Sequence, residues 1–260
     1  MFSEYLQRLK MTTTVTTSTD EDYSDKFLNA PDSPMRGVNC PLCKNTGQIT
    51  YIRDEDKTLW TKDCDCMKLR RNLVHIRESR LEDLVNKYTL EAYEEATPDN
   101  TVLKNKAVEY VKQSKPNDWF YISGQVGSGK SHLCVGMCSG FLMQGKTVRY
   151  MMWREDAPKL KALVNKAEEY EKVMKPFKSA DVLYIDDFLK GSHITDADMN
   201  IAFELINHRY NLNKRTIISS EMSIGQIAPY DEAVASRILE RSRMFCMIAP
   251  NHNWRKGRPK

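Results

Sequence analysis

Short apolar segments alternate with longer segments of mixed polarity through much of the chain. Five of the short segments have the length and composition of buried strands, and each is separated from the next by enough residues for a helix. Strands joined by helical crossovers are typical of a parallel sheet, so the pattern predicts an α/β fold with five parallel strands flanked by helices. The predicted strands are DWFYISG at 118–124, TVRYMMW at 147–153, DVLYIDD at 181–187, RTIISSE at 215–221 and MFCMIAP at 244–250.

The first hundred residues follow a different pattern. Residues 1–36 open with a short amphipathic segment and continue with Thr-rich and acidic sequence, which buries too little apolar surface to fold. Residues 67–95 have the charge pattern of one helix that ends at a Thr-Pro-Asp-Asn break. The predicted organisation is a flexible tail at 1–36, a cysteine module at 37–80, a linker at 81–100, the α/β domain at 101–250 and a basic tail at 251–260.

Composition narrows the possible classes of protein. A chain of 260 residues with 41% apolar content can bury one core and a small additional module. The apolar stretches are far shorter than the roughly 18 to 20 residues that span a bilayer, and no signal peptide is recognised, so we expect a cytoplasmic protein. The net charge of +4 does not establish nucleic-acid binding. However, residues 237–260 hold seven Arg or Lys and one acid, so this end of the chain could face phosphate.

GQVGSGKS at residues 124–131 fits the phosphate-binding pattern G-x-x-x-x-G-K-[ST] and lies between a predicted strand and a predicted helix. Gly127 and Gly129 permit backbone conformations that turn successive N–H groups toward phosphate oxygens. We expect Lys130 to reach the β- and γ-phosphates of ATP and the Ser131 hydroxyl to bind Mg²⁺. The other residues predicted to contact the nucleotide in this motif are Gly124, Ser128 and His132.

Two carboxylates end the third predicted strand. Asp186 is the expected partner of Mg²⁺ through water, and Asp187 stands where a carboxylate could orient or deprotonate the attacking water. Many ATPases carry Glu at the second position, so the shorter Asp187 must lie closer to that water or act through another one. The next strand ends in Ser-Ser-Glu at 219–221, where a polar side chain could sense the γ-phosphate.

Residues 232–243 have the pattern of a helix that carries Arg237 and Arg241 close to the same face. An arginine at such a position can enter the active site of a neighbouring subunit and offset phosphate charge, an effect worth roughly 10³ to 10⁵ in rate. The residues alone leave an ordinary surface arginine open as the alternative.

Four cysteines lie close together near the front of the chain: Cys40 and Cys43 in a C-x-x-C pair, then Cys64 and Cys66 in a C-x-C pair twenty residues later. Four thiolates in one short segment predict a closed, structural Zn²⁺ site. His75 is an alternative fourth ligand. So small a module has little apolar core, so metal binding, worth roughly 10 to 16 kcal/mol in small zinc peptides, would supply much of its folding energy. The remaining cysteines, Cys134, Cys138 and Cys246, are interpreted as core residues.

Two segments are candidates for contact with DNA. Residues 153–178 combine seven basic and five acidic residues with three aromatic ones, a mixture that can hold single-stranded DNA but is also typical of a solvated helix. The basic residues 253–260 could form an arm that contacts phosphate.

The order of GQVGSGKSH, VLYIDDFLKG, FELINHRYNLNKRTIISSEMS and ASRILER, behind CPLCKNTG and CDC, resembles replicative helicase loaders of the bacterial and phage DnaC/DnaI group. These are AAA+ ATPases with an N-terminal zinc module, and the resemblance covers about residues 37–250. It implies Mg²⁺- and ATP-dependent binding to a hexameric DnaB-type helicase and its loading onto single-stranded DNA. It also implies a homo-oligomer, Arg237 as the arginine finger, Ser220 or a neighbour as the γ-phosphate sensor, and the front module as the helicase contact.

The chain departs from the broader AAA+ pattern because we recognise no C-terminal lid domain with a second sensor, which leaves the adenine pocket undefined. Three alternatives stay open. An IstB-like transposition ATPase would act on duplex DNA and a transposase, a P-loop kinase would phosphorylate a small molecule, and an ATP-gated adaptor would depend little on hydrolysis. Paired carboxylates and the candidate arginine finger favour water as the acceptor over a small molecule.

Overall fold

The computed structural model describes residues 23–53, 57–191 and 193–256. The predicted tail at 1–36 therefore lies mostly outside the described residues. The chain divides into two compact units, Met1–Arg77 and Glu78–Lys260, which are described separately. Among the described residues, no helix has the length and apolar character that a membrane span requires.

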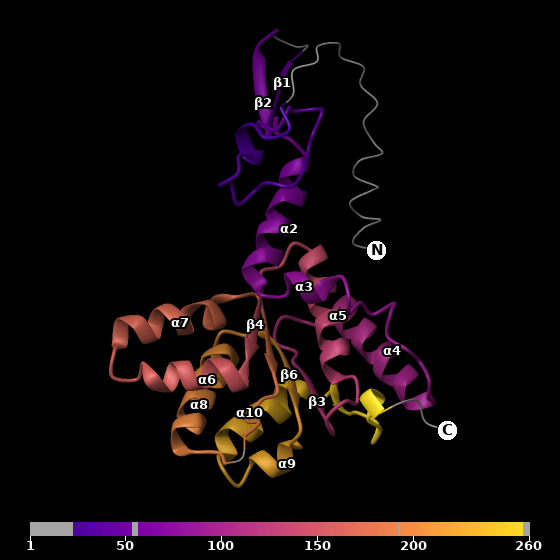
Figure 1. The fold of residues 1–260 in the computed structure, drawn as a ribbon, viewed down its shortest axis with the longest axis vertical. Coiled ribbons are helices and arrows are strands. Elements are labelled where there is room, and N and C mark those ends of the chain that lie inside the picture. Colours follow the sequence, from indigo (N-terminus) through magenta and orange to yellow (C-terminus); the bar gives the residue numbers. More distant parts are fainter. Residues whose placement is uncertain (1–22, 54–56, 192, 257–260) are drawn as a thin grey trace. The chain divides into compact units, whose positions relative to one another are not determined.

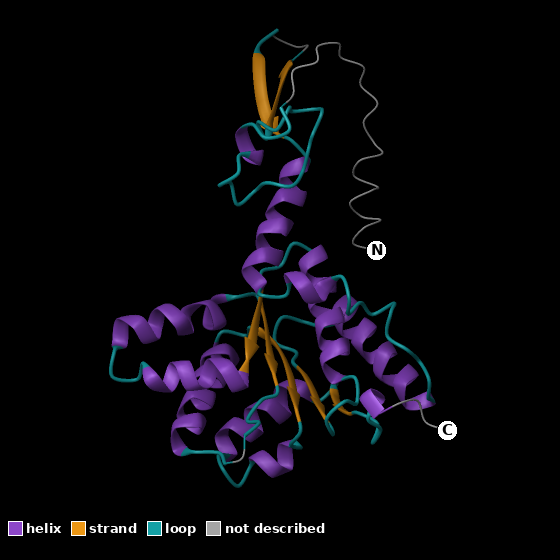
Figure 2. Ribbon diagram, viewed as in Figure 1, coloured by secondary structure: helices purple, strands orange, loops and turns teal. Residues whose placement is uncertain are grey.

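The second unit contains a five-stranded sheet, drawn in orange in Figure 2. Its strands are β3 (Phe120–Ser123), β4 (Val148–Met152), β5 (Val182–Asp186), β6 (Arg215–Ser220) and β7 (Cys246–Ile248). They lie in the order β4-β5-β6-β3-β7, and every neighbouring pair is parallel. The predicted five-stranded parallel sheet is confirmed. Because β5, β6 and β3 are adjacent, the residues that follow these three strands meet at one edge of the sheet.

Helices cover both faces of this sheet (Figure 1). One face carries α4 (Pro98–Gln113) and α5 (Lys130–Met143), with the short α3 (Glu82–Val85) against α5. The other face packs on α6 (Trp153–Ala162), α7 (Ala167–Ser179), α8 (Asp196–Asn211), α9 (Ile224–Ile227) and α10 (Glu232–Ser242). With both faces covered, β3, β5 and β6 are almost fully buried, which explains their continuous apolar sequences.

The single helix predicted at 67–95 is wrong. The chain forms α2 (Cys66–Ser79), breaks at Arg80, where φ is +67°, and resumes in α3. Arg80 donates from Nη1 to both carboxylate oxygens of Asp156, at 2.9 and 2.8 Å, and this ion pair stabilises the uncommon backbone conformation. The Thr-Pro-Asp-Asn segment is the start of α4, since the Thr97 hydroxyl accepts from the Asn100 N–H and Pro98 occupies the first turn.

The first unit has little apolar core. It contains the 3₁₀ helix η1 (Phe27–Asn29), an antiparallel hairpin of β1 (Gln48–Ile52) and β2 (Leu59–Asp63), and most of α2. The fully buried side chain of Arg70 on α2 donates to the main-chain oxygens of Met35 and Val38 and to the Oδ1 atoms of Asn29 and Asn45. Polar contacts from one arginine therefore hold the loop before β1 onto the helix.

Of the three cysteines predicted to lie in the core, two are buried and one is exposed. Cys134 and Cys138 on α5 are fully buried, as predicted. Cys246 is exposed, so that prediction is wrong. It lies on β7, which is three residues long and pairs only with β3 at the edge of the sheet.

Another buried arginine, Arg209 on α8, links several elements of the second unit through hydrogen bonds. It donates to the main-chain oxygens of Phe177, Ala180 and Arg215, and to the Thr216 hydroxyl. These bonds join α8 to the end of α7 and the start of β6, where buried carbonyl groups would otherwise lack donors.

Replacing Arg209 with Met should lower the free energy of unfolding by at least about 3 kcal/mol, because several buried carbonyl oxygens lose their donors. Urea denaturation followed by circular dichroism measures the change. Lys175→Met, at an exposed position of α7, is the matched control and should change stability by less than about 0.5 kcal/mol. Equal stability of the two variants would contradict the role assigned to Arg209.

Candidate functional site

The phosphate loop connects β3 to α5. Gly127 and Gly129 have φ values of +78° and +88°, in the left-handed region that glycine adopts without strain, and Gly129 caps α5. Lys130 is 6% exposed and its Nζ atom donates to the main-chain oxygens of Gly124 and Gln125, at 2.7 and 2.8 Å. Burial lowers the pKa of Lys130, while the nearby carboxylates of Asp187 and Glu221 act in the opposite direction. The loop thus folds around the ammonium group that is predicted to meet the phosphates.

Asp186, at the end of β5, faces α5. The hydroxyl of Ser131 donates to its Oδ1 atom at 3.1 Å. Mg²⁺ prefers hard oxygen ligands and keeps several waters, so a hydroxyl beside a carboxylate fits a magnesium ion that Ser131 would bind directly and Asp186 through water. The structure therefore brings together the two residues that the sequence assigns to Mg²⁺.

Three further hydroxyl groups point at the same carboxylate. Tyr184 donates to Oδ1 at 2.7 Å, Ser219 to Oδ1 at 2.5 Å and Tyr150 to Oδ2 at 2.9 Å. Burial, together with the charge of Asp186, raises the pKa of both tyrosines, so they stay protonated as donors. Sequence reasoning did not find the two tyrosines, and it named Ser219 only as a neighbour of Ser220 that could sense the γ-phosphate. The available signal was the alternation of strands, since Tyr184 lies two positions before Asp186 and opposite Tyr150 on β4.

Asp187 lies in a second polar group beside the first. Its φ of +54° is uncommon for a residue other than glycine, and its N–H donates to the Ser219 hydroxyl at 3.2 Å. Lys190 forms ion pairs with Asp187 at 3.1 Å and with Glu221 at 2.6 Å. A cavity of about 400 Å³, lined in part by both Asp186 and Asp187, opens beside the carboxylates. The cavity leaves room for a water or an incoming side chain from outside.

Ser220 and Arg237 lie apart from this cluster. The Ser220 hydroxyl is fully buried and donates to the Phe188 main-chain oxygen at 2.8 Å, so Ser219 is the serine of β6 that faces Asp186. Arg237 lies on α10, where its guanidinium is 5.4 Å from the ring centre of Phe203 and donates to the Ala233 main-chain oxygen. These contacts are with residues of α8 and α10, on the opposite face of the sheet from α5.

A second cavity, of about 410 Å³, lies beside the start of α5. Its lining includes Tyr93, Asn100, Gly129, His132 and Trp254. The His132 ring contacts the Tyr93 ring edge-on, and its Nε2 atom is 2.9 Å from the Thr89 main-chain oxygen. The predicted contact residue His132 therefore borders a space on the side of the phosphate loop that faces α4.

The segment at 153–178 does not offer the aromatic surface that was considered for DNA. Trp153 and Phe177 are 3% and 2% exposed within the core, and the Tyr170 hydroxyl donates to Glu204. Those rings are unavailable to stack on bases, so the solvated-helix interpretation fits better. Of the basic arm at 253–260, residues 257–260 lie outside the described residues.

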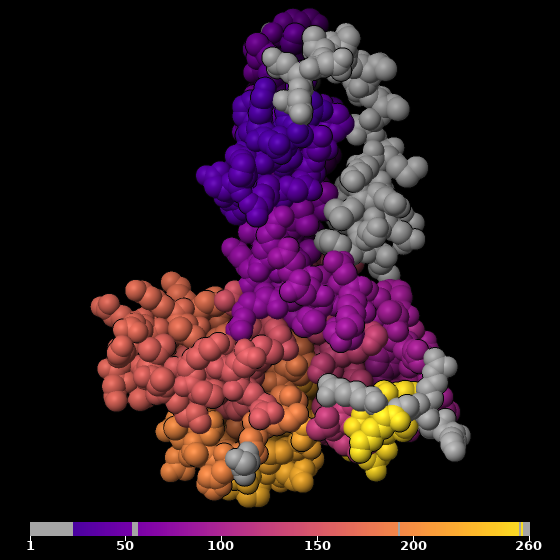
Figure 3. All heavy atoms as spheres, viewed as in Figure 1, coloured from indigo at the N-terminus to yellow at the C-terminus, as the bar shows by residue number. Residues whose placement is uncertain are grey.

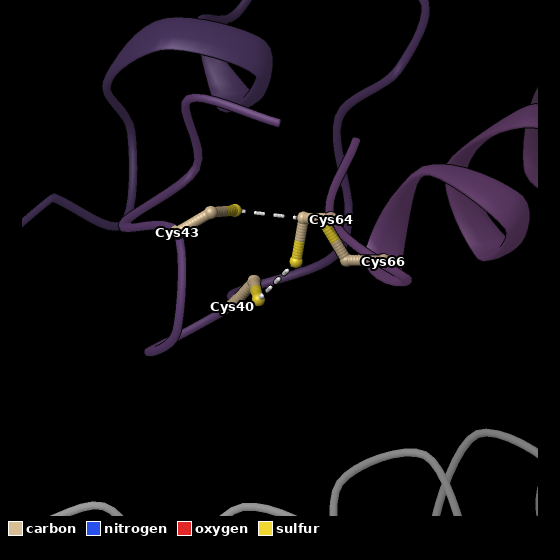
Figure 4. Close-up of side chains that lie close together, drawn as sticks. All are labelled: Cys40, Cys43, Cys64 and Cys66. Carbon is tan, nitrogen blue, oxygen red and sulfur yellow. Dashed lines mark hydrogen bonds between the residues drawn. The ribbon is translucent and has the colours of Figure 1, made fainter. Parts of the chain in front are cut away.

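The four cysteine sulfurs of the first unit converge on one point (Figure 4). All lie within 4.8 Å of one another, with 3.7 Å between the sulfurs of Cys40 and Cys64 and 3.5 Å between those of Cys43 and Cys66. Four sulfurs at about 2.3 Å from a tetrahedral Zn²⁺ lie about 3.8 Å apart, so the group fits zinc. The cluster comprises these four side chains and does not include His75.

The local backbone shapes this cluster. Lys44 and Asn45 both have positive φ, which turns the chain sharply after Cys43, and the Cys64 N–H donates to the Gly47 main-chain oxygen at 2.8 Å. Burial raises the pKa of Cys64 to about 11. A cation is the natural means of holding buried thiolates so close together.

The sheet order, the phosphate loop and the Ser131–Asp186 pair define a P-loop ATPase domain of the AAA+ class. A family model described as IstB-like ATP binding protein matches residues 61–254, and the chain belongs to this family. Members of the IstB, DnaC and DnaA group are AAA+ ATPases, so the chain is an ATPase of this kind.

Sequence relatives extend beyond the ATPase core. The phage-like element PBSX protein XkdC of Bacillus subtilis is 27% identical over 84% of this chain and 84% of its own length. The uncharacterized protein YqaM of the same organism is 28% identical over 75% of this chain and 65% of its own length. The replicative helicase loader DnaC of Escherichia coli is 23% identical over 58% of this chain and 60% of its own length. The chain thus spans about two thirds or less of two of these relatives.

Solved structures share the fold. The DnaC helicase loader superposes with a TM-score of 0.57 at 21% identity, over 64% of this chain and 98% of that structure. DnaI gives 0.51 at 19% identity, over 65% and 91%. The initiator DnaA bound to AMPPCP and single-stranded DNA gives 0.52 at 23% identity, over 62% and 49%. These similarities establish the AAA+ fold of the second unit.

The purified chain should contain one Zn²⁺ per molecule, and a strong chelator should unfold the first unit, because few apolar side chains are buried there. Metal analysis and hydrogen exchange of α2 measure the two effects. Cys43→Ser should lose the metal, whereas Cys246→Ser, at an exposed cysteine outside the cluster, should retain it. Zinc-free protein with an equally protected α2 would contradict a structural role for the metal.

Proposed function

We propose that the chain is an ATP-dependent loader that binds a hexameric DnaB-type replicative helicase and assists its placement on single-stranded DNA in the bacterial cytoplasm. Its AAA+ domain and its similarity to the helicase loader DnaC support this proposal. The observation that carries it further is the hairpin between the cysteine pairs. This hairpin exposes large apolar side chains: Tyr51 is 43% exposed, Ile52 60%, Leu59 74% and Trp60 46%.

So many exposed apolar side chains on a small hairpin are typical of a protein-binding surface. Cation–π contacts of Arg53 with Trp60 and of Lys62 with Tyr51 hold the two aromatic rings in place. A chain that carries both a zinc-organised module with such a surface and an ATPase domain fits a protein whose ATP state controls a partner.

In the proposed mechanism, Lys130 neutralises the β- and γ-phosphates. Ser131 and Asp186 would hold Mg²⁺, which would supply positive charge at the phosphates. Tyr150, Tyr184 and Ser219 fix the position of Asp186 by donating to its carboxylate. These donors restrict the rotation of the carboxylate, which lies beside the Ser131 hydroxyl.

Hydrolysis needs a base for the attacking water and a positive charge that offsets the charge of the γ-phosphate. Asp187, held by Lys190, borders the open cavity from which a water can approach. We assign Arg237 as the finger that a neighbouring copy inserts, because its own contacts within the chain lie on α10 and α8. Self-association in the ATP-bound form follows from this assignment.

The match to the IstB-like family keeps a transposition ATPase as the second candidate. Such a protein would bind duplex DNA and a transposase. The exposed hairpin does not favour it, since residues 48–63 carry four acids and three basic residues and lack the excess of positive charge that binds a DNA backbone.

Copurification with the replicative helicase of the host or phage, with and without ATP, tests the loader proposal. Leu59→Asp should abolish the complex by placing a charge in the apolar surface. Val164→Asp places the same charge at an exposed apolar position of the second unit and should preserve the complex. Both variants should retain zinc and ATP binding. Absence of a complex for the unaltered chain in both nucleotide conditions would eliminate the loader function.

Lys130→Ala should abolish nucleotide binding, and Arg237→Ala should bind ATP normally but hydrolyse it at least about 10³-fold more slowly. Mixing the two inactive variants should restore part of the activity, because a Lys130→Ala subunit can supply its Arg237 to a neighbour with an intact phosphate loop. A steady-state ATPase assay measures the rates. A mixture no more active than its components would exclude a finger acting between subunits.

A further inference from the structure

The chain returns to the phosphate loop after β7. The Ala249 N–H donates to the Ser123 main-chain oxygen at 2.7 Å, and the Trp254 N–H donates to the Gly127 main-chain oxygen at 3.0 Å. The short helix η2 (Trp254–Lys256) follows directly. Figure 3 shows this region in yellow, lying against the rest of the second unit. The segment at 252–256 therefore packs directly on the loop that is proposed to hold the phosphates.

This segment packs so closely on the loop that residue 127 has to be a glycine. A Cβ atom at Gly127 would lie 2.0 Å from Oδ1 and 2.6 Å from Cγ of Asn253. Gly127 also has a positive φ, so both its conformation and its contact with the segment exclude a side chain. The glycine consequently serves two purposes: it shapes the phosphate loop and admits the segment beside it.

Trp254 also lines the cavity of about 410 Å³ beside Gly129. Tyr93 and His132 line the same cavity, and the Asn100 amide donates to the Tyr93 hydroxyl at 2.9 Å. The His252 ring contacts the Trp254 ring edge-on, with 4.7 Å between ring centres. A space of this size with several aromatic walls and an amide fits a planar heterocycle and its sugar.

We propose that Trp254 binds the purine base of the nucleotide, so that residues 252–256 form the wall of the ATP site on the base side. The proposal rests on the proposed function, because it requires that the triphosphate lies on Lys130. Gly129 then joins the two halves of the site: its backbone starts α5 at the phosphates, and it also lines the cavity for the base. The wall comes from the segment after the last strand, where no lid domain was recognised in the sequence.

Calorimetric titration with Mg–ATP and with Mg–tripolyphosphate, which has no base, tests this role. Trp254→Ala should weaken ATP binding about 5- to 100-fold, the usual effect of removing one stacked aromatic ring. Its affinity for tripolyphosphate should remain that of the unaltered chain. Trp254→Phe should retain most of the ATP affinity, and Val102→Ala, an exposed truncation on α4 outside the cavity, should retain all of it.

Three results would overturn the proposal. Unchanged ATP affinity in Trp254→Ala would show that the ring does not touch the base. Equal weakening of ATP and tripolyphosphate would mean that Trp254 only supports the loop, and tighter ATP binding would mean that it obstructs the cavity. Failure of the underlying nucleotide site is distinguishable, because then the unaltered chain and Lys130→Ala would bind ATP equally poorly.

Discussion

The carboxylate of Asp186 is the point on which the arrangement of the ATPase unit depends. Its two oxygens accept hydroxyl hydrogens from Ser131 on α5, Tyr150 on β4, Tyr184 on β5 and Ser219 on β6. Three neighbouring strands and the phosphate-loop helix thereby share one partly buried acceptor. Charge-assisted hydrogen bonds are among the stronger polar contacts in proteins, so this cluster fixes the geometry of the sheet edge as well as that of the metal ligand.

Strand order makes this convergence possible. In a parallel sheet all carboxyl ends lie on one side, and the order β4-β5-β6-β3 places the ends of β5 and β6 beside the end of β3, from which the phosphate loop begins. The sequence therefore predicts the fold and the Ser131–Asp186 pair well, because both depend on strong local patterns. Apolar runs identify the strands, and the glycine-rich motif identifies the loop between strand and helix.

Residues whose role depends on long-range contact were not predictable in the same way. Tyr150 carries no motif, and Ser219 could not be told apart from Ser220 as the candidate sensor. Only the register of β4 and β6 against β5 brings Tyr150 and Ser219 to Asp186. The sequence around Arg70 and Arg209 is that of exposed positions on charged helices. In the structure both side chains are fully buried, and each donates to main-chain oxygens of loops distant in sequence. The break at Arg80 likewise follows from an ion pair with Asp156, some 76 residues later.

The two units are stabilised by different interactions, and this difference bears on the separate functions proposed for them. The ATPase unit is stabilised by a continuous apolar core, so its nucleotide site can exchange ligands without loss of the fold. The cysteine unit has few buried apolar side chains, and the apolar residues of its hairpin are exposed. A metal bound by the four thiolates would supply folding energy through Zn–S bonds and would relieve those residues of any part in a core. In the proposed function, Leu59 and Trp60 would then serve a partner, while Lys130 and Asp186 would respond to ATP.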